Sequence, residues 1–131
     1  MLPVLKYHKL TILWALFILF ICAVNLGHVG RSSFFFTGFD KVTHCGLFFV
    51  LVIFSCNGTI RQQKLKILPY KSAIILTAAA IVYGGLIELL QRTIFTWRSG
   101  EWGDFLSDAI GAGMAAFSIL IIQRALGHEK N

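Results

Sequence analysis

Three stretches of the chain, "DKVTHCGLF", "GGLIELLQ" and "GDFLSD", carry ionisable or amide side chains inside segments that are otherwise apolar. In each stretch two polar residues are three or four positions apart: Asp40 and His44, Glu88 and Gln91, Asp104 and Asp108. Residues at this spacing lie on one face of a helix, so each pair predicts a polar stripe. Carboxylates beside an imidazole can transfer protons, bind a cation or accept hydrogen bonds from a polar ligand.

We therefore predict a polar site, to which Arg98 in the adjacent "WRSGEWGD" adds a guanidinium for anions. Its predicted ligand-binding residues are Asp40, His44, Glu88, Gln91, Arg98, Asp104 and Asp108. The candidates for proton transfer are Glu88, His44 and Asp104. One histidine with two or three carboxylates could hold a divalent ion, but the chain has no H-E-x-x-H motif, and we predict neither a metal nor a cofactor.

The elements that must position these residues are long apolar segments. The chain has 131 residues, 56% of them hydrophobic and 14% charged, too few charges for the surface of a soluble domain. Four runs of 21, 19, 20 and 19 residues carry almost no charge: 10–30, 42–60, 72–91 and 105–123. A membrane-spanning helix needs about 20 apolar residues. The sequence thus predicts an all-α polytopic membrane protein, a bundle of four transmembrane helices with short loops forming one domain over residues 1–131.

The basic residues predict the orientation of these helices. Eight of the 12 lysines and arginines flank the chain ends or lie between the second and third spans. Since loops rich in Lys and Arg stay in the cytoplasm, we predict that both termini are cytoplasmic and that loops 31–41 and 92–104 face outward. This bias explains the net charge of +6 without a nucleic-acid partner.

The predicted depth of three ionisable residues in the membrane points to one shared cavity. His44, Glu88 and Asp108 each lie about one helical turn inside the outer boundary of their spans. An Asp facing lipid at mid-helix costs about 2.5–3.5 kcal/mol, so these side chains should face one another inside the bundle. Gly84 and Gly111, each in a small-xxx-small pattern, should let the third and fourth helices approach closely.

The same three motifs resemble, in order and spacing, the pattern of the VanZ-like family of small bacterial membrane proteins. The resemblance covers residues 40–116, although many family members have Asn where this chain has Asp108. The family's namesake is associated with resistance to the glycopeptide teicoplanin. The resemblance thus implies a place in the bacterial inner membrane and a role at the cell envelope.

We expect an outward-facing polar cavity that recognises an anionic or polar cell-envelope lipid or lipid-linked precursor. Two alternatives stay open: a membrane hydrolase or transferase acting on such lipids, and a transport or assembly component. A transporter should carry polar residues into the cytoplasmic half, where the chain has only isolated ones such as Asn57, Thr77 and Ser118. The oligomeric state is left open.

Overall fold

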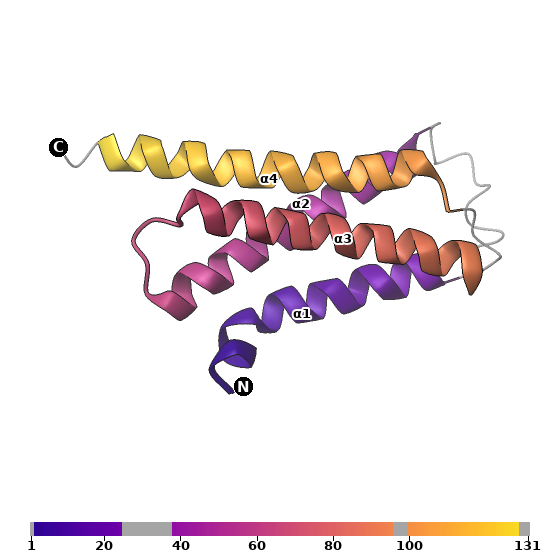
Figure 1. Ribbon diagram of the computed structural model, residues 1–131, viewed down its shortest axis with the longest axis horizontal. Helices are drawn as coiled ribbons and strands as arrows, with labels where there is room; N and C mark the ends of the chain where they lie inside the picture. Colours follow the sequence, from indigo (N-terminus) through magenta and orange to yellow (C-terminus); the bar gives the residue numbers. More distant parts are fainter. Residues whose placement is uncertain (1, 25–37, 96–99, 129–131) are drawn as a thin grey trace.

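A computed structural model describes residues 2–24, 38–95 and 100–128 of the chain. Its four helices are α1 (Leu2–Ala23), α2 (Phe39–Gln63), α3 (Tyr70–Thr93) and α4 (Trp102–His128). Successive helices run in opposite directions, and both chain ends lie toward the side of the α2–α3 connection (Figure 1). The predicted all-α four-helix architecture is confirmed.

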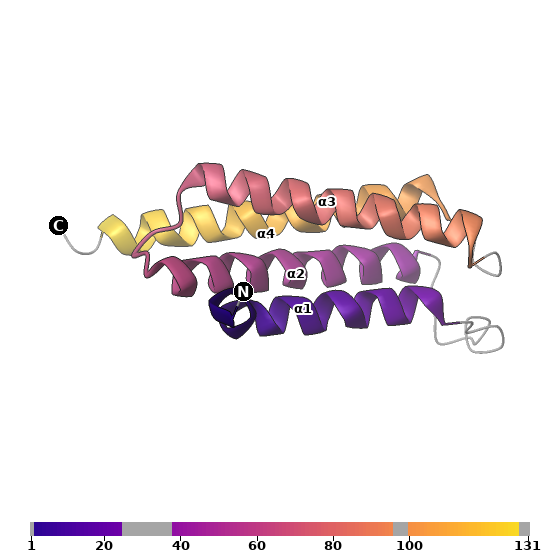
Figure 2. The same cartoon turned by 60° about the horizontal axis from the view of Figure 1, so that its bottom comes forward.

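The helices form two layers, with α1 beside α2 and α3 beside α4 (Figure 2). Helix α2 contacts all three others and packs most extensively against α4. Its buried residues recur every three or four positions, as a helix with one inward face requires: His44, Leu47, Phe48, Leu51, Val52, Cys56, Gly58 and Thr59. One end of this face is polar, so α2 carries both the core and part of the predicted site.

Helix α1 packs into the core through the buried residues Ile18 and Cys22, and hydrogen bonds add to this packing. Trp14 Nε1 donates to the Leu47 carbonyl at 2.9 Å, and Tyr83 Oη donates to the Ala15 carbonyl at 2.6 Å. Near the chain start, His8 Nε2 lies 3.0 Å from Gln62 Oε1. These contacts fix α1 against α2 and α3.

All four helices are long and apolar enough to cross a membrane, over Val4–Ala23, Phe39–Gln63, Tyr70–Thr93 and Trp102–Gly127. Large apolar side chains are exposed along their outer faces; Phe117 is 68% and Ile75 is 66% exposed. A soluble protein rarely exposes so much contiguous apolar surface, whereas lipid solvates it. The chain therefore has the architecture of a multi-pass membrane protein with four candidate spans.

The observed helices extend beyond the predicted spans, and the first is shifted. It begins at Leu2 rather than Leu10 and ends at Ala23, so Lys6 and Lys9 lie within it. A lysine near a helix end can extend its ammonium group toward the headgroups, so these charges do not interrupt a spanning helix.

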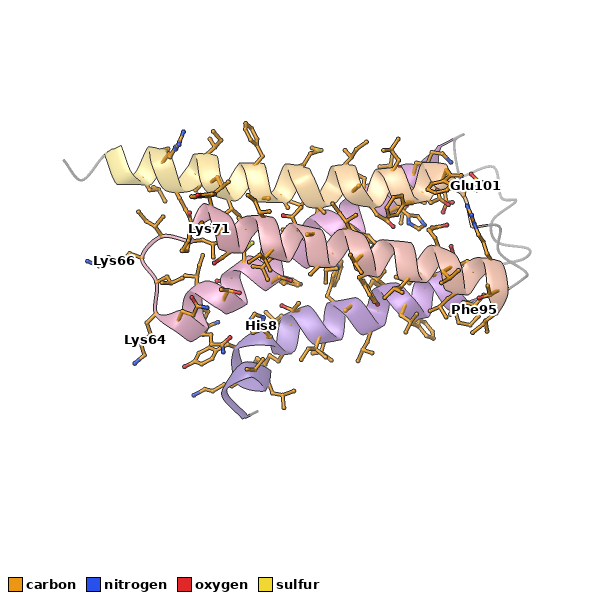
Figure 3. All side chains as sticks on the ribbon, in the orientation of Figure 1. His8, Lys64, Lys66, Lys71, Phe95 and Glu101 are labelled. Atoms are coloured by element: carbon orange, nitrogen blue, oxygen red, sulfur yellow. The ribbon has the colours of Figure 1, made fainter. Side chains whose placement is uncertain are left out.

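Lysine and acidic side chains are concentrated at opposite ends of the bundle, as the sequence predicts. Figure 3 shows Lys64, Lys66 and Lys71 near the α2–α3 connection and Glu101 at the opposite end. The connection begins at Lys64, whose left-handed backbone (φ 52°) ends α2. The acidic end is the one at which the predicted site residues lie.

Two glycines allow close helix packing, but between different pairs of helices. A Cβ at Gly84 of α3 would lie 2.8 Å from Asp108 Oδ2 of α4, consistent with the predicted approach of these helices. A Cβ at Gly111 of α4 would instead overlap the main-chain carbonyl of Cys45, on α2. The prediction that Gly111 brings α3 and α4 together is therefore wrong, because that face of α4 turns toward α2.

Candidate functional site

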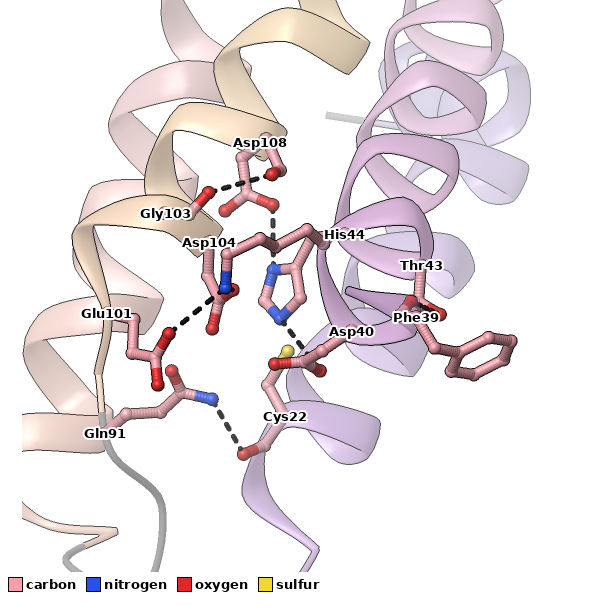
Figure 4. A network of polar contacts seen from close by, with 12 residues as sticks. Cys22, Phe39, Asp40, Thr43, His44, Gln91, Glu101, Gly103, Asp104 and Asp108 are labelled. Carbon is pink, nitrogen blue, oxygen red and sulfur yellow. Dashed lines mark hydrogen bonds and ion pairs between the residues drawn. The ribbon is translucent and has the colours of Figure 1, made fainter. Parts of the chain in front are cut away.

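The centre of the site is a buried pair formed by His44 of α2 and Asp108 of α4. Nδ1 of His44 lies 2.9 Å from Asp108 Oδ1, and the two side chains are 3% and 0% exposed (Figure 4). The other ring nitrogen, Nε2, points toward Asp40 Oδ1 at 4.0 Å. The ring is therefore oriented by carboxylates on both sides, as in sites where an imidazole exchanges protons or binds a metal.

A second group of charges closes the end of the bundle beside this pair. Lys41 Nζ lies 3.1 Å from Glu101 Oε2 and 3.5 Å from Asp104 Oδ1. Lys41 and Glu101 are half-exposed, whereas Asp104 is buried. These bonds link the start of α2 to the start of α4. Lys41 thus stabilises two of the carboxylates at this end.

Glu88 of α3 has no such partner. It is 6% exposed, and neither carboxylate oxygen has a hydrogen-bond partner among the described residues. An unsatisfied buried polar group costs about 1–3 kcal/mol, and more when it is charged. Glu88 is therefore the residue at which a ligand would restore the most lost hydrogen bonding.

Two residues of α3 near the site have roles that the sequence did not specify. Gln91 donates from Nε2 to the Cys22 carbonyl of α1 at 3.2 Å, although its Oε1 meets no hydrogen-bond donor in the described ranges. Arg92 donates from Nε to the Gly100 carbonyl at 3.2 Å, and its guanidinium carbon lies 5.4 Å from the Trp102 ring centroid. Among the described residues Arg92 forms no ion pair, so it is not the counterion of Glu88.

A pocket of about 260 Å³ opens between α3 and α4 beside Glu88. Its lining combines charged groups with an apolar wall: Gly85, Glu88, Leu89, Arg92, Glu101, Trp102 and Phe105. Trp102 is 75% exposed, and its ring packs edge-to-face against Phe105 with 6.1 Å between the ring centroids. The pocket can therefore receive a ligand that has both a polar and an apolar part.

The structure brings together most of the predicted site residues. Asp40, His44, Glu88, Asp104 and Asp108 gather at one end of the bundle, and Gln91 lies at its edge toward α1. Arg98 and residues 31–37 of the predicted outer loop lie outside the described residues. The sequence argument did not assign Glu101 or Arg92 to the pocket. The spacing of Arg92, four residues after Glu88, was the available signal.

Chemically, the arrangement can exchange protons through the His44 imidazole, accept hydrogen bonds at Glu88, or coordinate a cation. Within the described ranges, two sets of three side chains have ligand atoms within 4.8 Å of one another: Asp40, His44 and Asp104, and His44, Glu88 and Asp108. Comparison with protein-family models, curated proteins and solved structures finds no match to this chain.

Proposed function

We propose that this membrane protein binds the polar headgroup of a membrane lipid in the pocket between α3 and α4. The observation that supports this most is the buried carboxylate of Glu88 in the pocket wall, which has no hydrogen-bond partner among the described residues. Hydroxyl or ammonium groups of a headgroup would donate to it. Arg92, at the rim, would bind the phosphate, since guanidinium groups bind phosphate oxygens through paired hydrogen bonds.

The rest of the pocket suits an amphiphile. Leu89, Trp102 and Phe105 provide apolar surface beside the charged groups. Aromatic side chains at headgroup depth are common in membrane proteins, because their rings tolerate both lipid and water. A lipid could thus place its headgroup against Glu88 and Arg92 while its chains stay in the bilayer.

We further propose that the protein lies in the bacterial inner membrane, with the pocket facing outward and both termini in the cytoplasm. The support is the excess of basic residues at the opposite end of the bundle. The resemblance to the VanZ-like family extends the proposal to a cell-envelope lipid or lipid-linked precursor and to glycopeptide resistance.

Native mass spectrometry of the delipidated protein tests the binding proposal. Phosphatidylglycerol and phosphatidylethanolamine are added to wild type, Arg92→Gln and Glu88→Gln. Arg61→Gln is the matched control, since Arg61 is also in the last turn of its helix but lies outside the pocket lining. A charge-assisted hydrogen bond contributes about 1.5–3 kcal/mol, so both pocket variants should bind lipid at least about tenfold more weakly.

Equal lipid binding by the pocket variants and Arg61→Gln would disprove the proposal. Glycerol 1-phosphate and phosphoethanolamine form a second arm, as soluble headgroups without chains. If they bind as tightly as the intact lipids, the ligand is a free phosphate ester rather than a lipid.

A lipid hydrolase or transferase is the second candidate, favoured by the buried contact between His44 and Asp108. A carboxylate beside an imidazole orients the ring and stabilises its charged form during proton transfer. In this case the same lipids should release their headgroups when incubated with wild type, and His44→Gln should abolish the release. Unchanged lipids after incubation with folded wild-type protein would contradict the enzyme.

A further inference from the structure

The three residues His44, Glu88 and Asp108 form a second possible site, deeper than the lipid pocket. They come from α2, α3 and α4, and all three are buried. Each offers a ligand atom, and these atoms lie within 4.8 Å of one another. Three helices thus direct one imidazole and two carboxylates at a common point.

Carboxylate oxygens in this set of three residues lack hydrogen-bond donors within the described ranges, and a bound cation would stabilise them. Both oxygens of Glu88 and Oδ2 of Asp108 are buried without partners among the described residues. The nearby ammonium of Lys41 is directed at Glu101 and Asp104 instead. Two buried carboxylates are therefore left with one imidazole, and buried charges are normally paired or coordinate metals.

A glycine provides the space that Asp108 occupies. A Cβ at Gly84 would lie 2.8 Å from Asp108 Oδ2 and 3.3 Å from the Phe48 ring. Any larger residue at position 84 would displace this carboxylate. The backbone of α3 thus leaves room for the Asp108 carboxylate, although Oδ2 of this carboxylate has no hydrogen-bond partner among the described residues.

We propose that His44, Glu88 and Asp108 bind a divalent transition-metal ion of the Zn²⁺ or Mn²⁺ class. Imidazole and carboxylate are common ligands of Zn²⁺, and carboxylate oxygens also suit Mn²⁺. Ligand atoms about 2.0–2.2 Å from a tetrahedral ion lie about 3.4 Å from one another, so the side chains must close on the ion. Glu88 can rotate toward it, because no hydrogen bond from the described part of the chain holds its carboxylate.

The neighbouring set of Asp40, His44 and Asp104 is the weaker choice. Asp40 is exposed, and Asp104 already pairs with Lys41 at 3.5 Å. A cation there would compete with an ammonium group. The two sets share His44 but use different carboxylates, so substitutions can separate them. The metal proposal does not depend on lipid binding.

The test uses the full chain, purified in detergent without an affinity tag, stripped with EDTA and titrated with Co²⁺ as an optical probe for a Zn²⁺ site. Wild type should bind one equivalent, with a visible absorption spectrum typical of nitrogen and oxygen ligands, and Zn²⁺ should displace the Co²⁺. Loss of an outer-shell partner alone weakens metal binding about 10- to 100-fold, so Glu88→Gln and Asp108→Asn should weaken Co²⁺ binding at least about tenfold.

Two controls make the result specific. His8→Gln removes a histidine that lies near Gln62, away from the site, and should bind Co²⁺ as wild type does. Asp40→Asn removes a carboxylate 4.0 Å from Nε2 of His44 but no proposed ligand, so it should weaken Co²⁺ binding less than Glu88→Gln does. The proposal is overturned if folded wild type binds no Co²⁺, if a thiolate charge-transfer band shows that cysteine is the ligand, or if Asp40→Asn loses binding while Glu88→Gln keeps it.

Discussion

Replacement of Gly111 by alanine should destabilise the bundle, because this glycine lets α4 lie directly against the backbone of α2. A Cβ at position 111 would overlap the Cys45 carbonyl oxygen and would lie 2.8 Å from its carbonyl carbon and 3.0 Å from its Cα. These are main-chain atoms, which cannot rotate away as a side chain could. The helices must therefore separate or shift along each other.

The magnitude follows from a comparison with Gly113→Ala on the same helix. A Cβ at Gly113 would meet nothing within 4 Å. Both substitutions gain the helix propensity of alanine, about 0.5–1 kcal/mol, so this gain cancels in the difference between them. What remains is the cost of overpacking, about 1–3 kcal/mol, which should make Gly111→Ala the less stable variant.

Unfolding in mixed micelles with a rising fraction of SDS, followed by circular dichroism, measures this difference. The free energy of unfolding of Gly113→Ala should equal or exceed that of wild type, and that of Gly111→Ala should fall below both. If Gly111→Ala is as stable as Gly113→Ala, α2 and α4 are not in backbone contact at this level, and the assignment of Gly111 to this interface is refuted.

Two further predictions concern the attachment of α1 and the topology. Tyr83→Phe removes the 2.6 Å hydrogen bond to the Ala15 carbonyl and should lower the free energy of unfolding by about 0.6 kcal/mol, the average for such bonds in membrane proteins, whereas Tyr70→Phe, at a residue 62% exposed, should not. An equal effect of both would show that the Tyr83 bond does not hold α1. A reporter fused after Lys66 should be cytoplasmic, and a signal from the opposite side would invert the proposed orientation.

The sequence predicted the four helices because the apolar runs are long and nearly free of charge. It misplaced the start of α1, since Lys6 and Lys9 were treated as the boundary of the run although a helix continues through them. It also predicted the common depth of His44, Glu88 and Asp108, which depends only on their distance from the ends of their own helices.

The pairing of these residues was not predictable in the same way. The His44–Asp108 contact requires α2 and α4 to face each other, and no single helix specifies its neighbours. For the same reason the sequence predicted α3 rather than α2 as the helix that Gly111 contacts. Asp108 is not among the residues predicted to transfer protons, yet it is the carboxylate that contacts His44 most closely.

The hydrogen-bond and ion-pair partners of the acidic residues indicate whether this polar end of the bundle serves only to hold the helices together. A network that only held helices together would pair each acid with a base, as Lys41 does for Glu101 and Asp104. Among the described residues Glu88 has no such base, and an unpaired buried carboxylate costs stability. The presence of a carboxylate that destabilises the ligand-free protein is explained if a bound ligand stabilises that carboxylate.

The two proposed ligands of Glu88 approach it from different sides and use different companions. A headgroup enters from the pocket between α3 and α4 and depends on Arg92, which lines that pocket. A metal ion lies toward α2 and depends on Asp108, which does not line that pocket. Loss of Arg92 should therefore weaken lipid binding and spare Co²⁺, whereas loss of Asp108 should do the reverse. Because Glu88 serves both sites, only its substitution should affect both.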